Sequence, residues 1–159
     1  MIDYPKYKKV LFCTDFSDNS DYAFDYAFGI AKRDEALLYI LHVNPITPQQ
    51  ETYLRTYLNE EQFDEIGKKR HKEINQQFND RYLCQIRDKN NVQVVIKSGR
   101  EDEAIIKFAV QENVDLIVIG KHGKTGLESA VFGSVAEKVV RHSPIPVYII
   151  PRKAKSGAA

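Results

Sequence analysis

The segment that decides the fold runs from Val118 to Val135 and reads VIGKHGKTGLESAVFGSV. It opens with apolar residues typical of a buried strand, continues as a glycine-rich loop, and reaches Ser134, where a helix is expected to begin. Gly120 permits a sharp turn after the strand, while Gly123 and Gly133 allow backbone N–H groups to approach a ligand closely. A helix N-terminus adds free N–H groups and the positive end of the dipole, so the segment predicts a site for a polyphosphate.

A plainer interpretation of this loop is that the glycines only make turns and Ser134 only caps the helix. A single glycine usually serves that purpose, but glycines at Gly120, Gly123, Gly126 and Gly133 between a strand and a helix favour the phosphate site. Two better-known phosphate motifs are absent from the sequence. A Walker A loop would need glycine at position 118, which is valine here, and no G-x-G-x-x-G occurs.

Strand-like segments recur along the whole chain. Short apolar runs predict strands at Lys8–Thr14, Ala36–Val43, Val92–Gly99, Val114–Gly120 and Ile145–Ile150. The runs are nearly continuous in apolar residues, as expected for strands that are covered on both faces of a sheet.

Helical segments separate these strands. One helix is predicted after an N-cap at Ser17, a second after a capping box of Ser98 and Glu101, and a third over Ser134–His142. The charged stretch Glu51–Asn90 carries apolar residues at helical intervals and predicts one long amphipathic helix or a broken pair. The alternation predicts a single doubly wound, Rossmann-like α/β domain with a mainly parallel five-stranded sheet and helices on both faces.

Sheets of this kind bind ligands beyond the carboxyl ends of their strands, where the winding direction reverses. The loops of interest are therefore Thr14–Ser17, Val43–Pro48 and Gly120–Ser134. Because the first and fourth strands are expected to be neighbours at that point, Asp15 and Gly120 should flank a single crevice.

Length and composition restrict the classes of protein that remain. The 159 residues suit one domain, which we place at residues 1–152, with 153–159 as a flexible tail. A net charge of +1 argues against general binding to nucleic acid or to an anionic membrane, and no apolar run is long enough for a membrane span. The two cysteines, Cys13 and Cys84, indicate neither a disulfide framework nor a zinc site, so a cytoplasmic location is expected.

Three quoted segments together carry a family resemblance: VLFCTDFSDNS near the start, LHV at Leu41–Val43, and GKHGKTGLESAVFGSVAEKVVRHSPIPVYII at the end. Over about Lys8 to Pro151 the chain resembles the nucleotide-binding branch of the universal stress protein family. The resemblance implies a five-stranded α/β domain that binds ATP at the carboxyl edge of the sheet and pairs into dimers.

The resemblance also implies which residues contact the nucleotide. Thr14, Asp15 and Val43 would lie beside the adenine and its sugar, with Val43 acting through its backbone, and Ile119 and Gly120 at the ribose end. The phosphates would be surrounded by Gly123, Gly133, Ser134 and Val135. Ser134 would also be the residue to touch a Mg²⁺ ion bridged by the nucleotide.

The resemblance has one departure, at Cys13, where many relatives have proline. The change affects the wall near the base and puts base preference in question, but it leaves the phosphate loop intact. A reactive thiol here would need a lowered pKa. We expect a packed thiol instead, because free cysteines are commonly buried.

No catalytic residue is predicted. Asp15, His122 and Ser134 have the residue types of a hydrolytic triad, yet each has another explanation, and triads are defined by mutual geometry. Lys121 and Lys124 are candidates for neutralising phosphate charge or are simply exposed loop lysines. No general base stands out, so a nucleotide held as a regulatory or slowly hydrolysed ligand is favoured over efficient hydrolysis.

The sequence leaves two alternative functions to consider. A dimeric interaction module that does not depend on nucleotide is the main alternative, because the apolar strand Ile145–Ile150 would need an antiparallel twin to protect it at a sheet edge. A flavodoxin-like electron carrier is disfavoured, since the loop after Val118 offers Phe132 as its only aromatic residue.

Overall fold

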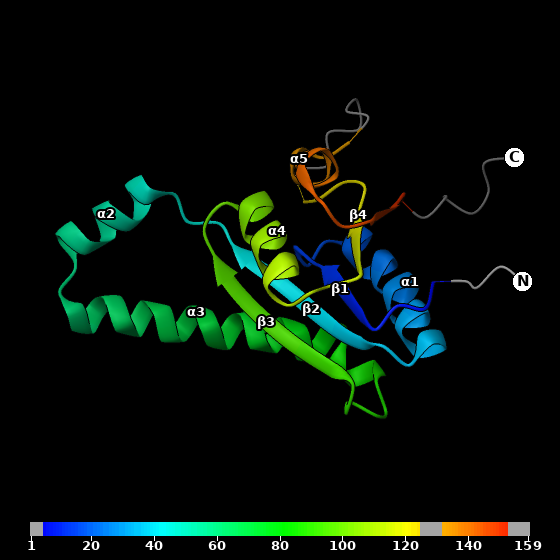
Figure 1. The fold of residues 1–159 in the computed structure, drawn as a ribbon. Coiled ribbons are helices and arrows are strands. Elements are labelled where there is room, and N and C mark those ends of the chain that lie inside the picture. Colours follow the sequence, from blue (N-terminus) through cyan, green and yellow to red (C-terminus); the bar gives the residue numbers. More distant parts are fainter. Residues whose placement is uncertain (1–4, 125–131, 153–159) are drawn as a thin grey trace, which may run out of the picture.

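The structure is a computed structural model, and it describes residues 5–124 and 132–152. Within these residues the chain forms one sheet of five strands: β1 (Lys9–Cys13), β2 (Leu37–Asn44), β3 (Val92–Ser98), β4 (Leu116–Gly120) and β5 (Val147–Ile150). The strand order is β3-β2-β1-β4-β5 and every neighbouring pair is parallel. The predicted doubly wound α/β fold is confirmed (Figure 1).

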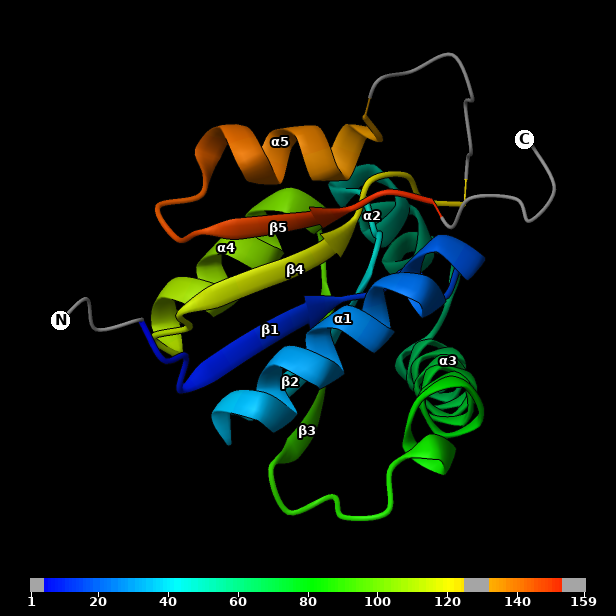
Figure 2. The ribbon, with the colours of Figure 1, turned by 90° about the vertical axis from the view of Figure 1, so that its right-hand side faces the viewer.

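Helices cover both faces of the sheet. They are α1 (Asp18–Asp34), α2 (Pro48–Tyr57), α3 (Glu60–Arg81), α4 (Glu101–Gln111) and α5 (Ser134–His142), with a short 3-10 turn, η1 (Leu83–Gln85). In Figure 2, α1 and α3 lie on one side of the sheet and α4 and α5 on the other. None of the described helices combines the length and apolarity that crossing a membrane requires.

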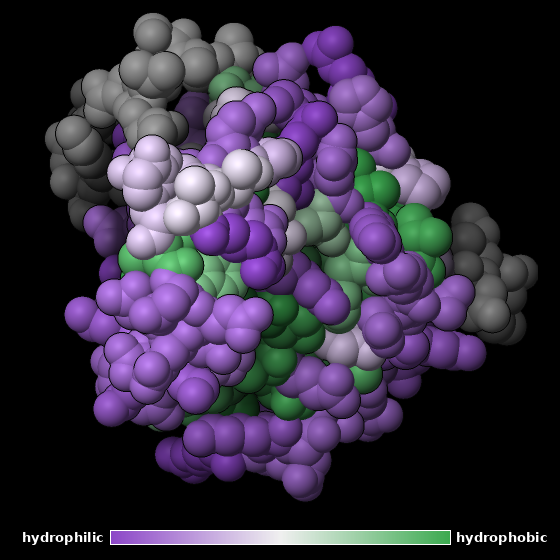
Figure 3. Space-filling model, turned by 90° about the vertical axis from the view of Figure 1, so that its left-hand side faces the viewer, coloured by the Kyte–Doolittle hydropathy of each residue, from purple (hydrophilic) through white to green (hydrophobic). Residues whose placement is uncertain are grey.

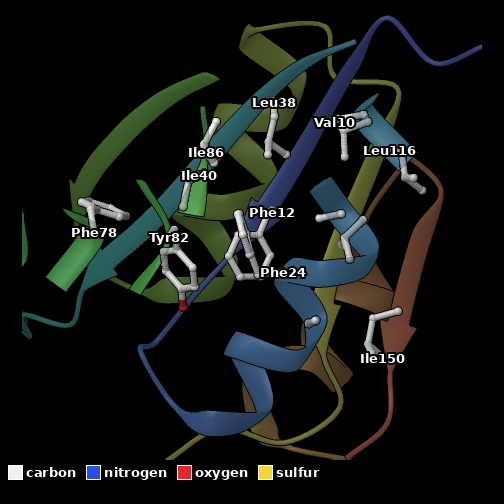
Figure 4. Close-up of a cluster of buried hydrophobic side chains, with 14 of the residues drawn as sticks. Val10, Phe12, Phe24, Leu38, Ile40, Phe78, Tyr82, Ile86, Leu116 and Ile150 are labelled. Atoms are coloured by element: carbon white, nitrogen blue, oxygen red, sulfur yellow. The ribbon is translucent and has the colours of Figure 1, made fainter. Parts of the chain in front are cut away.

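The core has two halves because strand side chains alternate between the two faces. On one face α1 and α3 pack on β1, β2 and β4, and Figure 4 shows Phe12, Phe24 and Tyr82 meeting at its centre. On the other face α4 and α5 pack on the alternate strand residues, including Leu11, Leu41 and Ile117. This double coverage explains the apolar run of β4, in which every residue is buried.

Several local predictions can now be compared with the structure. Ser17 caps α1 as predicted, since its side chain accepts a hydrogen bond from the Ser20 N–H. The prediction of a capping box formed by Ser98 and Glu101 is wrong, because the N-cap residue of α4 is Arg100. Ser98 is the last residue of β3, paired in register with Asn44, and the chain turns at Gly99 with φ of 122° before α4 begins. Strand pairing therefore uses the residue that local sequence had assigned to a cap.

The last strand is shorter than predicted, Val147–Ile150 in place of Ile145–Ile150. Ser143 explains the difference, because its hydroxyl group accepts the Ile145 N–H at 3.0 Å and donates to the Ile145 carbonyl at 2.8 Å. The local turn occupies the backbone groups that a longer strand would have used. The predicted tail, 153–159, lies outside the described residues.

The charged stretch from Glu51 to Asn90 was predicted as one long helix or a broken pair of helices, and the structure shows the pair, α2 and α3. The helix α2 begins with a capping box of Thr47 and Gln50, and α3 begins with a second box of Asn59 and Gln62. Among the described residues α2 buries none, while α3 buries only Ile74 and Phe78. Figure 1 shows α2 and the first half of α3 projecting well beyond the sheet.

Candidate functional site

A cleft of about 330 Å³ opens at the carboxyl ends of the strands, between β1 and β4 where the winding direction reverses. Its walls come from the ends of β1, β2 and β4, the loop after β4, and the first turns of α4 and α5. Nine residues singled out from the sequence line this one cleft: Thr14, Asp15, Val43, Ile119, Gly120, Gly123, Gly133, Ser134 and Val135. The structure thus brings together residues that lie far apart in the sequence.

The register of the sheet explains this convergence. β1 and β4 are parallel neighbours, with Cys13 opposite Ile119, so Asp15 and the loop after Gly120 leave the sheet side by side. The carboxylate of Asp15 joins them, because its Oδ2 accepts the Lys124 N–H at 2.8 Å. The expectation that Asp15 and Gly120 flank one crevice is confirmed.

Asp15 is also tied to the start of α1. Its Oδ1 accepts the Ser17 N–H at 3.0 Å and the Ser20 hydroxyl at 2.6 Å. Burial acts to raise the pKa of Asp15, but hydrogen bonds from Ser17, Ser20 and the Lys124 N–H outweigh it and hold the pKa below its usual value. Asp15 is therefore an ionised carboxylate that fixes the position of the glycine loop.

Two glycines in the loop are required by close contacts within the protein. A Cβ atom at Gly123 would lie 2.5 Å from Asp15 Oδ2, and one at Gly120 would overlap the Asn19 side chain. The Asn19 amide donates to the His122 carbonyl at 2.9 Å, which holds the same loop. From the sequence, Gly120 was explained by a sharp turn and Gly123 by the approach of a ligand, whereas in the structure the Asn19 and Asp15 side chains occupy the space beside these two glycines.

The helix α5 directs its N-terminus at the cleft. Gly133 is its N-cap residue, no side chain makes a capping hydrogen bond there, and Ser134 is the first helical residue. The interpretation in which Ser134 caps the helix is therefore wrong. Ser134, Val135 and Ala136 all line the cleft, so the first turn of α5 offers N–H groups that no side chain caps.

The opposite wall is built by the turn after β1. Thr14 is buried, and its hydroxyl group lies 2.6 Å from the Tyr82 hydroxyl group and accepts the Phe16 N–H at 2.9 Å. Phe16 adopts a left-handed backbone conformation with φ of 61°, which is uncommon for a bulky residue. Its ring lies against His42, with ring centroids 4.5 Å apart. These contacts fix the direction in which Asp15 leaves the strand.

Among the polar residues that line the cleft, Ser20, His42 and Glu101 were not assigned to the site from the sequence, and among the apolar ones Ile105 was not assigned. The ring of His42 hydrogen-bonds the Thr14 carbonyl at 2.9 Å, and burial lowers the pKa of His42. Burial, followed by the nearby Asp15 charge, raises the pKa of Glu101 in the first turn of α4. His42 lies inside the quoted LHV segment, which was the available signal; Glu101 carried only a helix-start signal.

Other sequence candidates have clear positions. Cys13 is buried in the cleft wall, and burial raises the pKa of its thiol, which confirms the packed thiol. Lys124 lines the cleft, whereas Lys121 places its ammonium group 5.4 Å from the centre of the Phe132 ring. The part of the chain that the structure describes contains no group of three or more metal-ligating acidic, histidine or cysteine side chains.

Comparison with known proteins places the chain in a family. The profile of the Universal stress protein family matches residues 6–151. Universal stress protein MJ0577 from Methanocaldococcus jannaschii is 31% identical over 170 residues, covering 92% of this chain and 96% of MJ0577. The chain therefore belongs to the universal stress protein family.

Solved structures agree with this assignment. The structure of MJ0577 superposes with a TM-score of 0.73 at 27% identity, covering 95% of this chain and 100% of that one. Universal stress protein UspA from Lactobacillus plantarum gives a TM-score of 0.70 at 27% identity, covering 92% and 99%. A universal stress protein in complex with cAMP shares the fold, with a TM-score of 0.63 at 24% identity over 92% of this chain and 98% of that one.

Proposed function

We propose that the cleft binds ATP as a regulatory or slowly hydrolysed ligand, and that the protein acts as a cytoplasmic homodimer in a stress response. The observation that carries the proposal is the convergence of Asp15, Gly123 and Ser134, with the other six predicted contacts, on a single cleft at the switch point. One protein of this fold, the cAMP complex, holds an adenine nucleotide, so the fold accommodates this ligand class.

The chemistry of the walls suits the two ends of a nucleotide. The phosphates would meet the N–H groups at the start of α5 and the positive charge of Lys124, which lines the cleft. The base and sugar would lie against Val43, Ile105 and Ile119 on the strand side. A volume of about 330 Å³ is at the lower end of the usual range for small-molecule sites, which is roughly 300–1,000 Å³.

Magnesium would enter with the nucleotide. The Ser134 hydroxyl group lines the cleft beside the phosphate end, and serine oxygen is a ligand type found in Mg²⁺–nucleotide sites. Asp15 is already held by Ser17, Ser20 and Lys124, which suits a positioning role better than activation of water. Turnover is therefore expected to be slow.

The dimer would form through the last strand, predicted as Ile145–Ile150. β5 lies at an edge of the sheet and, within the described residues, pairs with β4 alone. Tyr148 is 44% exposed on this edge. Antiparallel pairing with the same strand of a second copy would satisfy its backbone groups. The free thiols of Cys13 and Cys84 suit a reducing cytoplasm.

The first experiment is to purify the protein without nucleotide, denature it, and identify the released small molecules by mass spectrometry. Calorimetric titration with ATP then follows, on the wild type and on Gly123→Val, with Gly29→Val as the matched control. Gly29 lies in a helix with nothing within 4 Å of an added Cβ, so that control should leave binding unchanged. Absence of adenine nucleotide from the extract, together with no binding of added ATP, would overturn the proposal.

The exposed β5 edge favours a second candidate, a dimeric interaction module that does not depend on nucleotide. Light scattering on wild type and on Tyr148→Glu tests the dimer directly. If Gly123→Val abolishes ATP binding but dimer mass and stress tolerance of a complemented deletion strain are unchanged, the interaction module is the better account.

A further inference from the structure

A second hollow lies next to the strand-end cleft, with which it shares Pro45 at the end of β2. We call it the α2–α3 groove; it has a volume of about 840 Å³ and is walled by α2, α3, the end of β2 and the edge strand β3. Its apolar lining consists of Ile46, Tyr53, Leu54, Phe63, Ile66, Ile74 and Ile96. Figure 3 views this end of the molecule and shows an apolar hollow at its centre, ringed by hydrophilic residues.

The floor of the groove is one stripe of α3. Positions 63, 66, 67, 70, 71 and 74 line the groove, and this spacing places them on one face of a helix. The stripe continues into the core at Ile74 and Phe78, which are 8% and 1% exposed. Towards the other end Ile66 is 47% exposed, although it belongs to the same face. The sheet therefore covers only half of an apolar stripe, and the other half faces the groove.

The groove lining carries one carboxylate, Glu51, and one guanidinium group, Arg70, and only the carboxylate is held in an ion pair among the described residues. Its one lining carboxylate, Glu51, is bound by Arg55 through hydrogen bonds of 3.1 and 2.9 Å. Arg70 donates two hydrogen bonds, of 3.1 and 2.8 Å, to the neutral amide oxygen of Asn44, and no ion pair joins it to a carboxylate among the described residues. Lys68, Lys69 and Lys72 are close to Arg70 in the sequence of α3, as is Glu73 one turn further along, and none of these four residues lines the groove. A guanidinium group thus lies beside an apolar hollow without an anionic partner.

The dimensions favour a small ligand over a protein helix. The volume falls within the roughly 300–1,000 Å³ of small-molecule sites. The uncovered part of the stripe, from Phe63 to Arg70, spans only about 10 Å at 1.5 Å per residue. A docked helix would bury two turns there, well short of the roughly 1,000 Å² expected of a specific protein interface.

We propose that the α2–α3 groove is a second ligand site, and that it binds an anionic amphiphile with a single alkyl chain and a carboxylate head group. The chain would lie against Leu54, Ile66 and Ile96. The head group would pair with Arg70, whose guanidinium group forms no ion pair with a carboxylate among the described residues. Apart from Pro45, the lining of this groove differs from that of the proposed nucleotide site, and the ligands differ in chemistry, so each proposal is tested by its own ligand.

Gly67 allows the groove to be filled by design. It lies in the middle of α3 and lines the groove, and an added Cβ would meet nothing within 4 Å. Leucine at this position should therefore fold normally and occupy the space of the ligand chain. Gly29 in α1 has the same open surroundings and lies outside both sites, which makes Gly29→Leu the matched control.

The experiment is calorimetric titration of the full chain with octanoate, decanoate and dodecanoate below their micelle-forming concentrations. Affinity should rise about fifteenfold for each two-carbon extension, as expected for burial of two methylene groups. Dodecyltrimethylammonium, which has the same chain and the opposite charge, should bind at least tenfold more weakly than dodecanoate. Gly67→Leu should weaken dodecanoate binding at least tenfold, and Gly29→Leu should leave it unchanged.

A second pair of variants tests the head group. Arg70→Gln should weaken dodecanoate binding about fivefold, as for an exposed ion pair, whereas Lys69→Gln on the outer face should not. The proposal is overturned if dodecanoate does not bind, if Gly67→Leu binds it normally, or if ATP displaces it. The proposal is also overturned if a second copy of the chain closes the groove. Light scattering would then give a dimer mass for the wild type and for Gly29→Leu, but a monomer mass for Gly67→Leu.

Discussion

The strand-end cleft and the α2–α3 groove are both hollows, but they are built in opposite ways. In the cleft each key group is held by several others, as Asp15 is held by Ser17, Ser20 and Lys124. In the groove one wall, α2, buries no residue among those described. A parallel sheet therefore fixes the geometry at its strand ends, whereas two projecting helices leave apolar surface uncovered.

The two sites meet at the end of β2. Pro45 lines both hollows, and Asn44 next to it accepts the hydrogen bonds from Arg70. Val43, the residue expected to contact adenine, immediately precedes Asn44. Substitutions that alter one hollow and leave the other intact can therefore test how the two differ.

The largest expected effect is a difference in stability between two positions of the helix α3. Phe78 is 1% exposed in the core, so Phe78→Ala should lower the free energy of unfolding by about 3–5 kcal/mol. Phe63, on the same stripe in the groove, is only half-buried, and Phe63→Ala should cost less than about 1 kcal/mol. Urea unfolding of both variants measures the difference. Equal losses would show that the groove is packed as tightly as the core.

A substitution at Gly123 should affect the cleft alone. In Gly123→Val the new Cβ would lie 2.5 Å from Asp15 Oδ2, so the loop must move away from the carboxylate. ATP affinity should fall about a hundredfold, or about 2.7 kcal/mol, while dodecanoate binding to the groove remains unchanged. Calorimetry with each ligand measures both. Loss of both affinities would mean that the two hollows are not independent.

The charge on Asp15 should give a pH-dependent contribution to stability. Its pKa is lowered in the folded protein, so its contribution is present above the ordinary aspartate pKa and is lost as the pH falls through the folded value. Asp15→Asn should therefore lower the free energy of unfolding by about 1–3 kcal/mol at pH 7. The gap between wild type and variant should shrink at pH 3 in urea unfolding. A gap that stays constant would contradict this role of the charge.

The smallest expected effect is a gain in stability from a substitution in the groove. Gly67→Ala places a methyl group in open space within a helix and should raise the free energy of unfolding by up to about 1 kcal/mol. Gly120→Ala in the cleft should be destabilising, because its Cβ would overlap the Asn19 side chain. Thermal unfolding of the two variants compares them. The same sign at both positions would contradict the contrast between the two regions.

Much of the fold and of the candidate site was predictable from local patterns. The apolar runs of β1, β2 and β4 were clear signals because these strands are covered on both faces, whereas the edge strands β3 and β5 are partly exposed. Where prediction failed, a contact from elsewhere in the chain was responsible. Ser98 was assigned to a helix cap, but its pairing with Asn44 of β2 keeps it in a strand. Glu101 could not be assigned to the site because only the folded sheet brings the start of α4 to the cleft.

By itself the sequence determined the order of strands and helices, the parallel sheet and the set of loops that meet at its carboxyl edge. These follow from periodicity, caps and glycines, which act over a few residues. Only the tertiary structure decided that Gly123 and Gly120 make room for Asp15 and Asn19, and that the stripe of α3 is half covered. The physical reason is that such contacts join residues far apart in the chain, so they exist only after the sheet has formed.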